Sequence, residues 1–215
     1  MDECESESVK LTLMIKKSYI VLFCMLISAG SYAAEKVPGQ ILYADKTVDV
    51  TFLIPVGLFG GGPNTEVLQK GVRFLDAKGK KKKLKPDQAK EFRFSFGGEN
   101  FRMVSHVNAV QLLAMSSHIF LLQLIDGPVK MFEYRQTTTS GGGPNMPVNS
   151  TQTVSYFLQK GAGDLVQPRT LGFKKEMAEY FSDCPALVAS IQEKEFKRRD
   201  LDEIVMFYNE RCGSK

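Results

Sequence analysis

Two cysteines near the C-terminus are the residues whose chemistry is easiest to argue. Cys184 and Cys212 lie far beyond the other two cysteines of the chain, Cys4 and Cys24. In an oxidising compartment such a pair forms a disulfide, whereas the cytosol keeps thiols reduced. A second interpretation makes Cys184 a nucleophile or redox thiol, because a helix N-terminus lowers the pKa of a thiol. No Cys-x-x-Cys motif supports it, so we predict a disulfide.

The two histidines offer little for catalysis or metal binding. His106 and His118 have no ligand-type neighbours at the spacing of a metal site, which usually needs three or four ligands. Ser105 lies beside His106 but lacks the Gly-x-Ser-x-Gly frame that presents a hydrolase nucleophile. We interpret both histidines as polar loop or strand-end residues. The sequence predicts no catalytic residues, no metal site and no cofactor, and we do not expect an enzyme.

Six lysines crowd together in the middle of the chain. They are Lys78, Lys80, Lys81, Lys82, Lys83 and Lys85. Such a run can bind an anionic ligand, either the phosphate of a lipid head group or an acidic polysaccharide. It can also be a solvated hairpin tip, which the turn sequence Asp76-Ala77-Lys78-Gly79 favours. No aromatic residues interleave the lysines, and the net charge is only +4, so no nucleic-acid partner is predicted.

Two further patterns, one aromatic and one glycine-rich, each allow a functional and a structural interpretation. Four phenylalanines at strand spacing could line a ligand cavity, but aromatics in this pattern more often form core. They are Phe92, Phe94, Phe96 and Phe101.

The string Gly-Gly-Gly-Pro-Asn occurs at Gly60–Asn64 and again at Gly141–Asn145. Neither copy is followed by Lys-Ser/Thr or by an obvious helix, so we interpret them as flexible loops rather than phosphate-binding loops or a true repeat.

The N-terminus carries the pattern of a secretory signal peptide. Lys16 and Lys17 precede an apolar run from Tyr19 to Ile27, and small residues then lead to a cleavage site between Ala33 and Ala34. The rival interpretation is a retained membrane anchor, but a transmembrane helix needs about 20 apolar residues. We therefore predict export, with no transmembrane segment in the mature chain.

The chain divides into three predicted parts. Residues 1–33 form the signal peptide, with translation expected to start at Met14 because the preceding residues are acidic. Residues 34–167 form a β-rich domain, and residues 168–215 form a C-terminal helical cap. About 180 mature residues suffice for a substantial core.

The β-rich part follows a period of two with turn residues between its segments. Thr47–Ile54 alternates cleanly, with Phe52 and Ile54 on one face and Thr51 and Leu53 on the other. Six further strands are expected at Val72–Leu75, Glu91–Phe96, Phe101–Val104, Ile119–Ile125, Val129–Arg135 and Thr153–Gln159. Seven or eight strands joined by short turns predict an α+β fold built on an antiparallel meander, as a roll, a barrel-like sheet or a sandwich.

After Pro168 the period becomes helical. Helices are expected over Phe173–Phe181, from Pro185 to about 194, and over Leu201–Cys212. The last should begin with a capping box made by Asp200 and Glu203. A short connector makes the second and third helices antiparallel neighbours, which brings the two cysteines together.

Several segments resemble a family of uncharacterised exported proteins of Gram-negative bacteria. They are Pro38-Gly39-Gln40-Ile41, Asp45-Lys46-Thr47-Val48, Leu84-Lys85-Pro86-Asp87, Asp126-Gly127-Pro128-Val129-Lys130-Met131-Phe132-Glu133-Tyr134, Ser182-Asp183-Cys184-Pro185 and Tyr208-Asn209-Glu210-Arg211-Cys212. The Asp-Cys-Pro to Tyr-Asn-x-x-Cys end is the most specific part. The resemblance implies export and an envelope setting, and it implies no activity.

Two functional hypotheses follow. The first is a non-enzymatic binding or structural module of the cell envelope, periplasmic or extracellular, with an envelope protein, lipid or glycan as partner. The second is a ligand-binding or enzymatic domain that acts on a lipid or glycan through a pocket in a β-roll. A cavity with convergent polar groups would favour the second hypothesis.

Overall fold

The computed structural model describes residues 34–57, 61–107, 118–142 and 148–213. These residues belong to one compact unit, Ala34–Lys215. The predicted signal peptide, with Met14 and the residue before the cleavage point, lies outside the described residues. None of the helices described is long and apolar enough to cross a bilayer.

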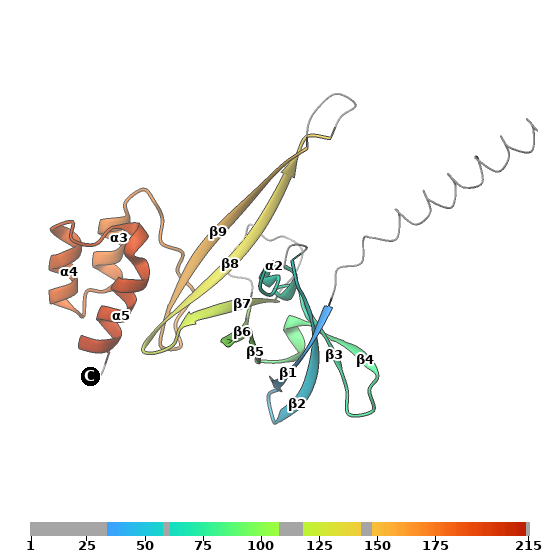
Figure 1. Cartoon of the computed structure of the whole chain (residues 1–215). Helices are drawn as coiled ribbons and strands as arrows, with labels where there is room; N and C mark the ends of the chain where they lie inside the picture. The colour runs from blue at the N-terminus through green and yellow to red at the C-terminus, as the bar shows by residue number, and fades with distance from the viewer. Residues whose placement is uncertain (1–33, 58–60, 108–117, 143–147, 214–215) are drawn as a thin grey trace, which may run out of the picture. The chain divides into compact units, whose positions relative to one another are not determined.

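In the described part of the chain, nine strands form one antiparallel sheet (Figure 1). The strands are β1 (Ala34–Leu42), β2 (Thr47–Pro55), β3 (Val72–Leu75), β4 (Lys81–Leu84), β5 (Glu91–Phe96), β6 (Glu99–Val107), β7 (His118–Ile125), β8 (Val129–Ser140) and β9 (Asn149–Lys160). Their order in the sheet is β4-β3-β2-β1-β5-β6-β7-β8-β9. The prediction of an α+β fold with an antiparallel sheet is confirmed.

The sequence missed strands β1 and β4. β1 contains Pro38 and Gly39, which usually break strands. Pro38 is tolerated because pairing between β1 and β5 begins only at Gly39, so that Pro38 needs no N–H on that side. A Cβ at Gly39 would lie 2.3 Å from the backbone oxygen of Arg93, so only glycine allows this close approach. β4 was not predicted because three of its four residues are lysines, which show no apolar alternation.

The predicted turn at Asp76–Gly79 is confirmed, because Gly79 N–H donates to the carbonyl of Asp76 at 2.8 Å. The lysine run is only partly a hairpin tip, since the chain rejoins the sheet at Lys81 and three of the six lysines lie in β4. Strand β4 lies at one edge of the sheet. Lysines on an edge strand discourage pairing with other chains, which explains part of the run without any ligand.

The first core cluster lies on the inward faces of strands β1 to β7. Phe92 and Phe94 are buried there and stack at 6.1 Å between ring centroids, and Phe120 of β7 meets Phe92 edge-on at 4.9 Å. Phe96 and Phe101 pack against this cluster from its margin. The phenylalanine stripe is thus core, as predicted, and not the lining of a cavity.

Two short helices that the sequence did not predict complete this core. They are α2 (Thr65–Leu68) and the 3₁₀ helix η2 (Pro86–Gln88). α2 follows the first triglycine string, whose Asn64 caps it by accepting a hydrogen bond from Val67 N–H at 3.2 Å. The expectation that neither string precedes a helix was wrong for this copy. Gly60 of this first copy and residues 143–145 of the second copy lie outside the described residues.

Strands β8 and β9 extend well beyond their neighbour β7, whose pairing with β8 reaches only Glu133. Beyond Glu133, the side chain of Gln69 hydrogen-bonds to β8 in place of a neighbouring strand. Its amide accepts from Arg135 N–H at 2.8 Å and donates to Arg135 C=O at 2.9 Å. Glu66 of α2 then accepts from the Thr137 hydroxyl at 2.6 Å. Two side chains thereby anchor the base of the hairpin, and its outer residues are exposed.

The C-terminal cap contains α3 (Phe173–Tyr180), α4 (Pro185–Gln192), the 3₁₀ helix η3 (Arg198–Asp200) and α5 (Leu201–Arg211). The three predicted helices are confirmed. Their apolar faces pack with Val129, Met131 and Leu158 of the sheet in a second core cluster. The capping box was wrong, because the Asp200 carboxylate turns back to accept from Lys197 N–H at 2.9 Å and makes no cap to α5.

Candidate functional site

Strand register places basic side chains from four strands in or beside one line. Strands β1 and β2 pair Lys36 with Leu53, and β2 and β3 pair Leu53 with Arg73. Strands β3 and β4 then pair Arg73 with Lys83, and Lys81 lies two residues before Lys83 on the same side. Directly paired residues point to the same face of a sheet. We call the surface formed by Lys36, Arg73, Lys81 and Lys83 the basic face.

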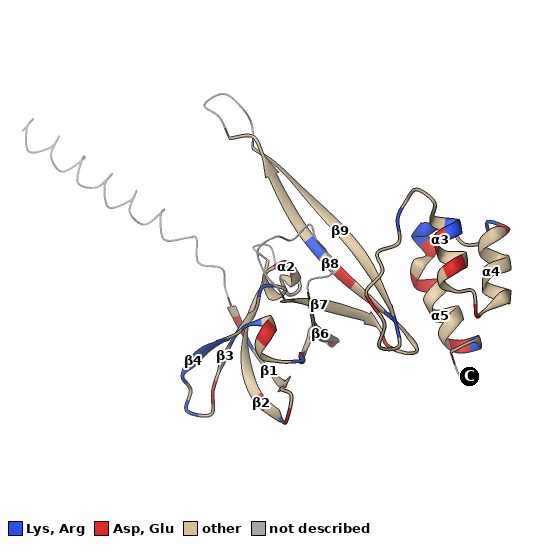
Figure 2. Cartoon of the chain, turned by 180° about the vertical axis from the view of Figure 1, so that it is seen from behind, with Lys and Arg blue, Asp and Glu red and all other residues tan. Residues whose placement is uncertain are grey.

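The basic face is the outer side of this part of the sheet. Its four cations are exposed, and Leu53 lies half-buried between them, as does Leu75, which is paired with Lys81. The opposite side carries the buried Phe52 and Phe74. Figure 2 shows Lys and Arg colouring β4 and part of β3.

Charge on the basic face is not neutralised by the described residues. Within the described ranges, none of its four cations forms an ion pair or a side-chain hydrogen bond with an acid. Arg73 and Lys83 are direct cross-strand partners, and like charges in that position destabilise a sheet. Protection of an edge strand explains the lysines of β4, but it does not explain Lys36 and Arg73, which lie on inner strands.

The structure separates the six predicted lysines. Lys81 and Lys83 join the basic face. Lys82 points to the other side of β4 and pairs with Asp76 at 3.2 Å. The remaining three lie outside the strand: Lys78 and Lys80 are exposed in the turn, and Lys85 precedes η2.

Asp76 organises the turn at the end of this surface. Its Oδ1 accepts hydrogen bonds from the backbone N–H groups of Lys80 at 2.9 Å and Lys78 at 3.0 Å. The bond from Lys80 is the main cause of a lowered pKa for this carboxyl, although desolvation opposes it. The one acid in the lysine run is therefore committed to the turn and to Lys82.

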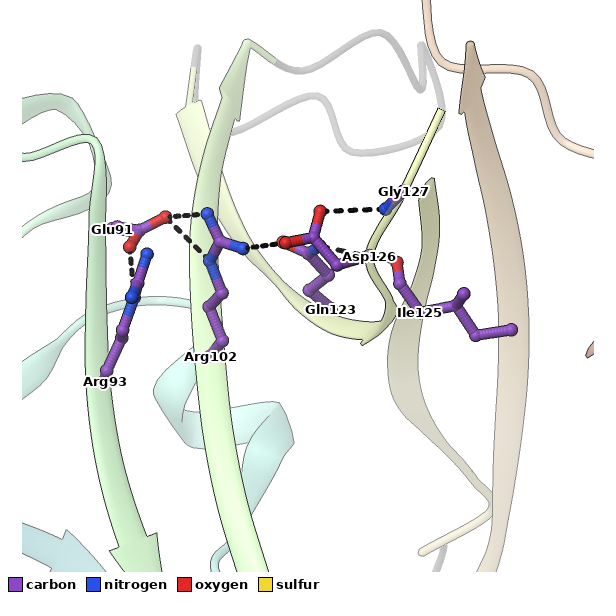
Figure 3. A network of polar contacts seen from close by, with 7 residues as sticks. All are labelled: Glu91, Arg93, Arg102, Gln123, Ile125, Asp126 and Gly127. Atoms are coloured by element: carbon purple, nitrogen blue, oxygen red, sulfur yellow. Dashed lines mark hydrogen bonds and ion pairs between the residues drawn. The ribbon is translucent and has the colours of Figure 1, made fainter. Parts of the chain in front are cut away.

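In a second charged cluster, on β5, β6 and the β7–β8 turn, the charges are paired with one another (Figure 3). Glu91 is buried and binds both Arg93 and Arg102, the latter at 2.8 Å. Arg102 also binds Asp126 at 2.7 Å. Burial alone would lower the pKa of Arg102, but the hydrogen bond and charge of Glu91, assisted by Asp126, raise it.

The Glu91 cluster therefore has a structural role. It links the β5–β6 hairpin to the turn before β8, and its two arginines are matched by two carboxylates. A hollow of about 90 Å³ next to it, lined by residues that include Glu91 and Arg93, has room for about three water molecules. Because its charges already neutralise one another, we do not regard it as a ligand site.

Segments that are distant in sequence meet where the cap joins the sheet. Asn209 of α5 accepts from Val129 N–H and donates to Val129 C=O, both at 2.8 Å. Tyr208 donates to Asp183 at 2.6 Å, and Lys160 of β9 binds the other oxygen of that carboxylate at 2.6 Å. Desolvation would raise the pKa of Asp183, but these hydrogen bonds outweigh it and lower that pKa.

This junction gives a structural role to three residues that lie in the segments of the predicted resemblance. Asp183, Val129 and Asn209 all belong to them. The bonds that they form connect strand to helix. We therefore assign these residues to the junction between sheet and cap.

The disulfide lies beside the junction. Cys184 and Cys212 are bonded, with their Cα atoms 5.8 Å apart, and Cys184 is fully buried. The predicted pairing is confirmed. Both sulfurs are used in this bond, so the alternative of a reactive Cys184 thiol has no support in this state of the protein.

The histidines are separate from these clusters. His106 packs edge-on against Phe132 with ring centroids 4.6 Å apart, and its Nε2 has no hydrogen-bond partner among the residues described. Burial, with a smaller contribution from Lys130, lowers the pKa of His106 to about 4. His118 begins β7. Within the described ranges, no group of three or more His, Cys, Asp or Glu side chains could hold a metal ion.

One larger groove lies where η3 and α5 meet the sheet. Its volume is about 260 Å³, and its lining includes Met131, Tyr156, Arg198 and Leu201. The second sequence hypothesis expected a pocket inside the β-rich part. The inward faces of β1 to β7 are instead filled by the first core cluster, and this groove is at the boundary with the cap.

Comparison with protein-family models, with curated proteins and with solved structures gave no match. The site therefore has to be interpreted from its own geometry. Sequence reasoning found the β4 lysines but missed Lys36 and Arg73. Each is a single charge in an alternating segment, and nothing local distinguishes it from any other solvent-facing residue.

Proposed function

We propose that this protein is an exported, non-enzymatic binding module that docks on an anionic membrane surface through its basic face. The observation that carries the proposal is the register-aligned set of Lys36, Arg73, Lys81 and Lys83, none of which forms an ion pair within the described ranges. A cation near an anionic leaflet contributes about 1 kcal/mol. Four cations on one face therefore amount to about 4 kcal/mol of electrostatic attraction before any apolar contact.

The composition of the face favours lipid over acidic polysaccharide. Leu53 and Leu75 lie between the cations, so that charge and apolar surface share one plane, as they do at a bilayer interface. An acidic polysaccharide would be bound by the cations alone and would leave Leu53 and Leu75 without a partner.

Export is supported from two directions. The first is the predicted signal peptide, and the second is the Cys184–Cys212 disulfide, which is stable in an oxidising compartment. The family resemblance supports an envelope setting. We infer that the protein acts in the periplasm or outside the cell.

We further infer that the sheet curls as a roll. Phe120 N–H of β7 donates to the carbonyl of Gln69 at 3.1 Å, which ties β7 to the segment between β2 and β3. Strands β4 and β9 nevertheless remain the two edges of the sheet. Curling supports the proposal because it holds the basic face on a rigid outer surface.

The test is co-sedimentation of the purified, disulfide-bonded protein with vesicles. Binding should be seen with vesicles of phosphatidylglycerol and phosphatidylcholine, should be absent with phosphatidylcholine alone, and should weaken as salt is raised. Arg73→Glu with Lys83→Glu should reduce the partition coefficient at least about 30-fold, since two cations contribute about 2 kcal/mol. Lys175→Glu with Lys197→Glu is the matched control, because it makes the same charge change on the exposed cap.

Equal binding to neutral vesicles would overturn the proposal. So would an Arg73→Glu, Lys83→Glu variant that binds no more weakly than the control. Binding to immobilised alginate but not to vesicles would reject the lipid surface and assign the basic face to an acidic polysaccharide.

A further inference from the structure

The groove between sheet and cap combines an apolar floor with cations at its mouth. The floor is formed by Met131 of β8 and Leu201 of α5, both of which are almost completely buried. Leu124 of β7 also lines the groove, and it is one of the few large apolar side chains of the described chain that stay exposed, at 44%. The groove therefore offers apolar surface that the protein itself leaves uncovered.

The charged groups of the groove are two arginines and one acid. Arg199 is exposed and already pairs with Asp200 at 3.2 Å. Asp202 is exposed on α5. Arg198 makes one long hydrogen bond, from Nε to the carbonyl of Pro168 at 3.5 Å, and its terminal amino groups have no acceptor within the described ranges. Arg198 is thus the cation with unused hydrogen-bonding capacity.

These features select one class of occupant. The planar fork of a guanidinium binds a carboxylate or a phosphate through two parallel hydrogen bonds. The floor beside it suits an aliphatic chain. A volume of about 260 Å³ compares with about 30 Å³ per water molecule in the liquid, so the groove holds roughly nine non-hydrogen atoms.

We propose that the groove binds a single-chain anionic amphiphile, with its head group on Arg198 and about the first six carbons of its chain over Leu124, Met131 and Leu201. The head group is a carboxylate or a phosphate monoester, since both satisfy the same fork. A longer chain would leave through the open side of the groove. This site is separate from the basic face, and the inference does not depend on membrane docking.

The test is an NMR titration of the ¹⁵N-labelled, disulfide-bonded protein with octanoate, octyl phosphate and 1-octanol. The anionic ligands should shift the backbone amides of Leu124, Tyr156 and Leu201, and octanol should bind at least tenfold more weakly. Arg198→Gln should weaken octanoate binding at least tenfold and leave octanol binding unchanged. Leu124→Ser should weaken all three ligands, and Lys175→Gln is the control that should change none.

Equal affinity for octanoate and octanol would overturn the proposal, as would shifts that map elsewhere or the absence of binding. A preference for octyl phosphate over octanoate would assign the site to phosphorylated lipids, and the reverse to fatty acids. The Arg73→Glu, Lys83→Glu variant should keep octanoate binding, so failure of membrane docking and failure of this site can be told apart.

Discussion

Asn209 should be the most important single hydrogen-bonding side chain between cap and sheet. Its amide forms both of its bonds with the two backbone groups of Val129, at 2.8 Å each, in the manner of a strand partner. It also lies against Gly127, where a Cβ would come within 2.6 Å of the amide nitrogen. The change Asn209→Ala removes both bonds and leaves the N–H and C=O of Val129 without a partner.

The expected loss of stability in Asn209→Ala follows from those two hydrogen bonds. A net hydrogen bond contributes about 1 kcal/mol, and a buried group left unsatisfied costs about 1–3 kcal/mol. The site is only partly buried, so water replaces some of the loss. We expect Asn209→Ala to lower the free energy of unfolding by about 2–3 kcal/mol, measured by urea unfolding with the disulfide intact.

A double-mutant cycle with Gly127→Ala tests the geometry. Gly127 has φ +145°, so alanine is strained there in any background, and in the wild type it also collides with Asn209. Without the Asn209 side chain only the strain remains. The double variant should therefore be more stable than the sum of the two single losses, by about 1 kcal/mol or more.

Either of two results would contradict this role of Asn209. One is an Asn209→Ala variant within 0.5 kcal/mol of the wild type, which is about the size of an ordinary surface substitution. The other is strict additivity with Gly127→Ala, which would show that the two residues do not meet in solution.

Two further predictions concern the disulfide and the buried histidine. Replacing Cys184 and Cys212 by alanine opens a loop with a sequence separation of 28 and should cost about 3.5 kcal/mol in urea unfolding; a loss below 1 kcal/mol would contradict it. Burial lowers the pKa of His106 from about 6.5 in the unfolded chain to about 4 in the folded protein, so the native state favours the neutral ring and stability falls as pH drops from about 6.5 to 4. Partial exposure reduces that loss to about 2 kcal/mol. His106→Phe should lose about 2 kcal/mol less than the wild type on going from pH 7.5 to 4; equal losses would exclude His106 as the cause.

Local patterns predicted much of the fold. Alternation, a continuous apolar run and turn residues located seven strands, and helical spacing located α3, α4 and α5. The disulfide was also predictable, because two helices joined by a short connector place Cys184 and Cys212 at adjacent ends. Each of these inferences uses only residues that are close in sequence or a constraint between neighbouring elements.

No local pattern predicts the two places where a side chain hydrogen-bonds to a strand in place of a neighbouring strand. Gln69 completes the pairing of β8 beyond β7, and Asn209 does the same at the start of that strand. An amide residue in a polar segment looks the same whether it faces water or a distant strand. The capping box failed for a related reason, since Asp200 had a closer donor in Lys197 N–H.

The amino-acid pattern was enough to predict most strand faces, the three cap helices and the cysteine pair, because periodicity records which side chains avoid water. The basic face and the groove, by contrast, arise from the folded arrangement of distant segments. The basic face exists because strand order and register align Lys36 with Arg73 and Lys83, and register is fixed by pairing between segments far apart in the chain. The groove exists because η3 and α5 meet β7 to β9 at one place, and no local pattern encodes that meeting.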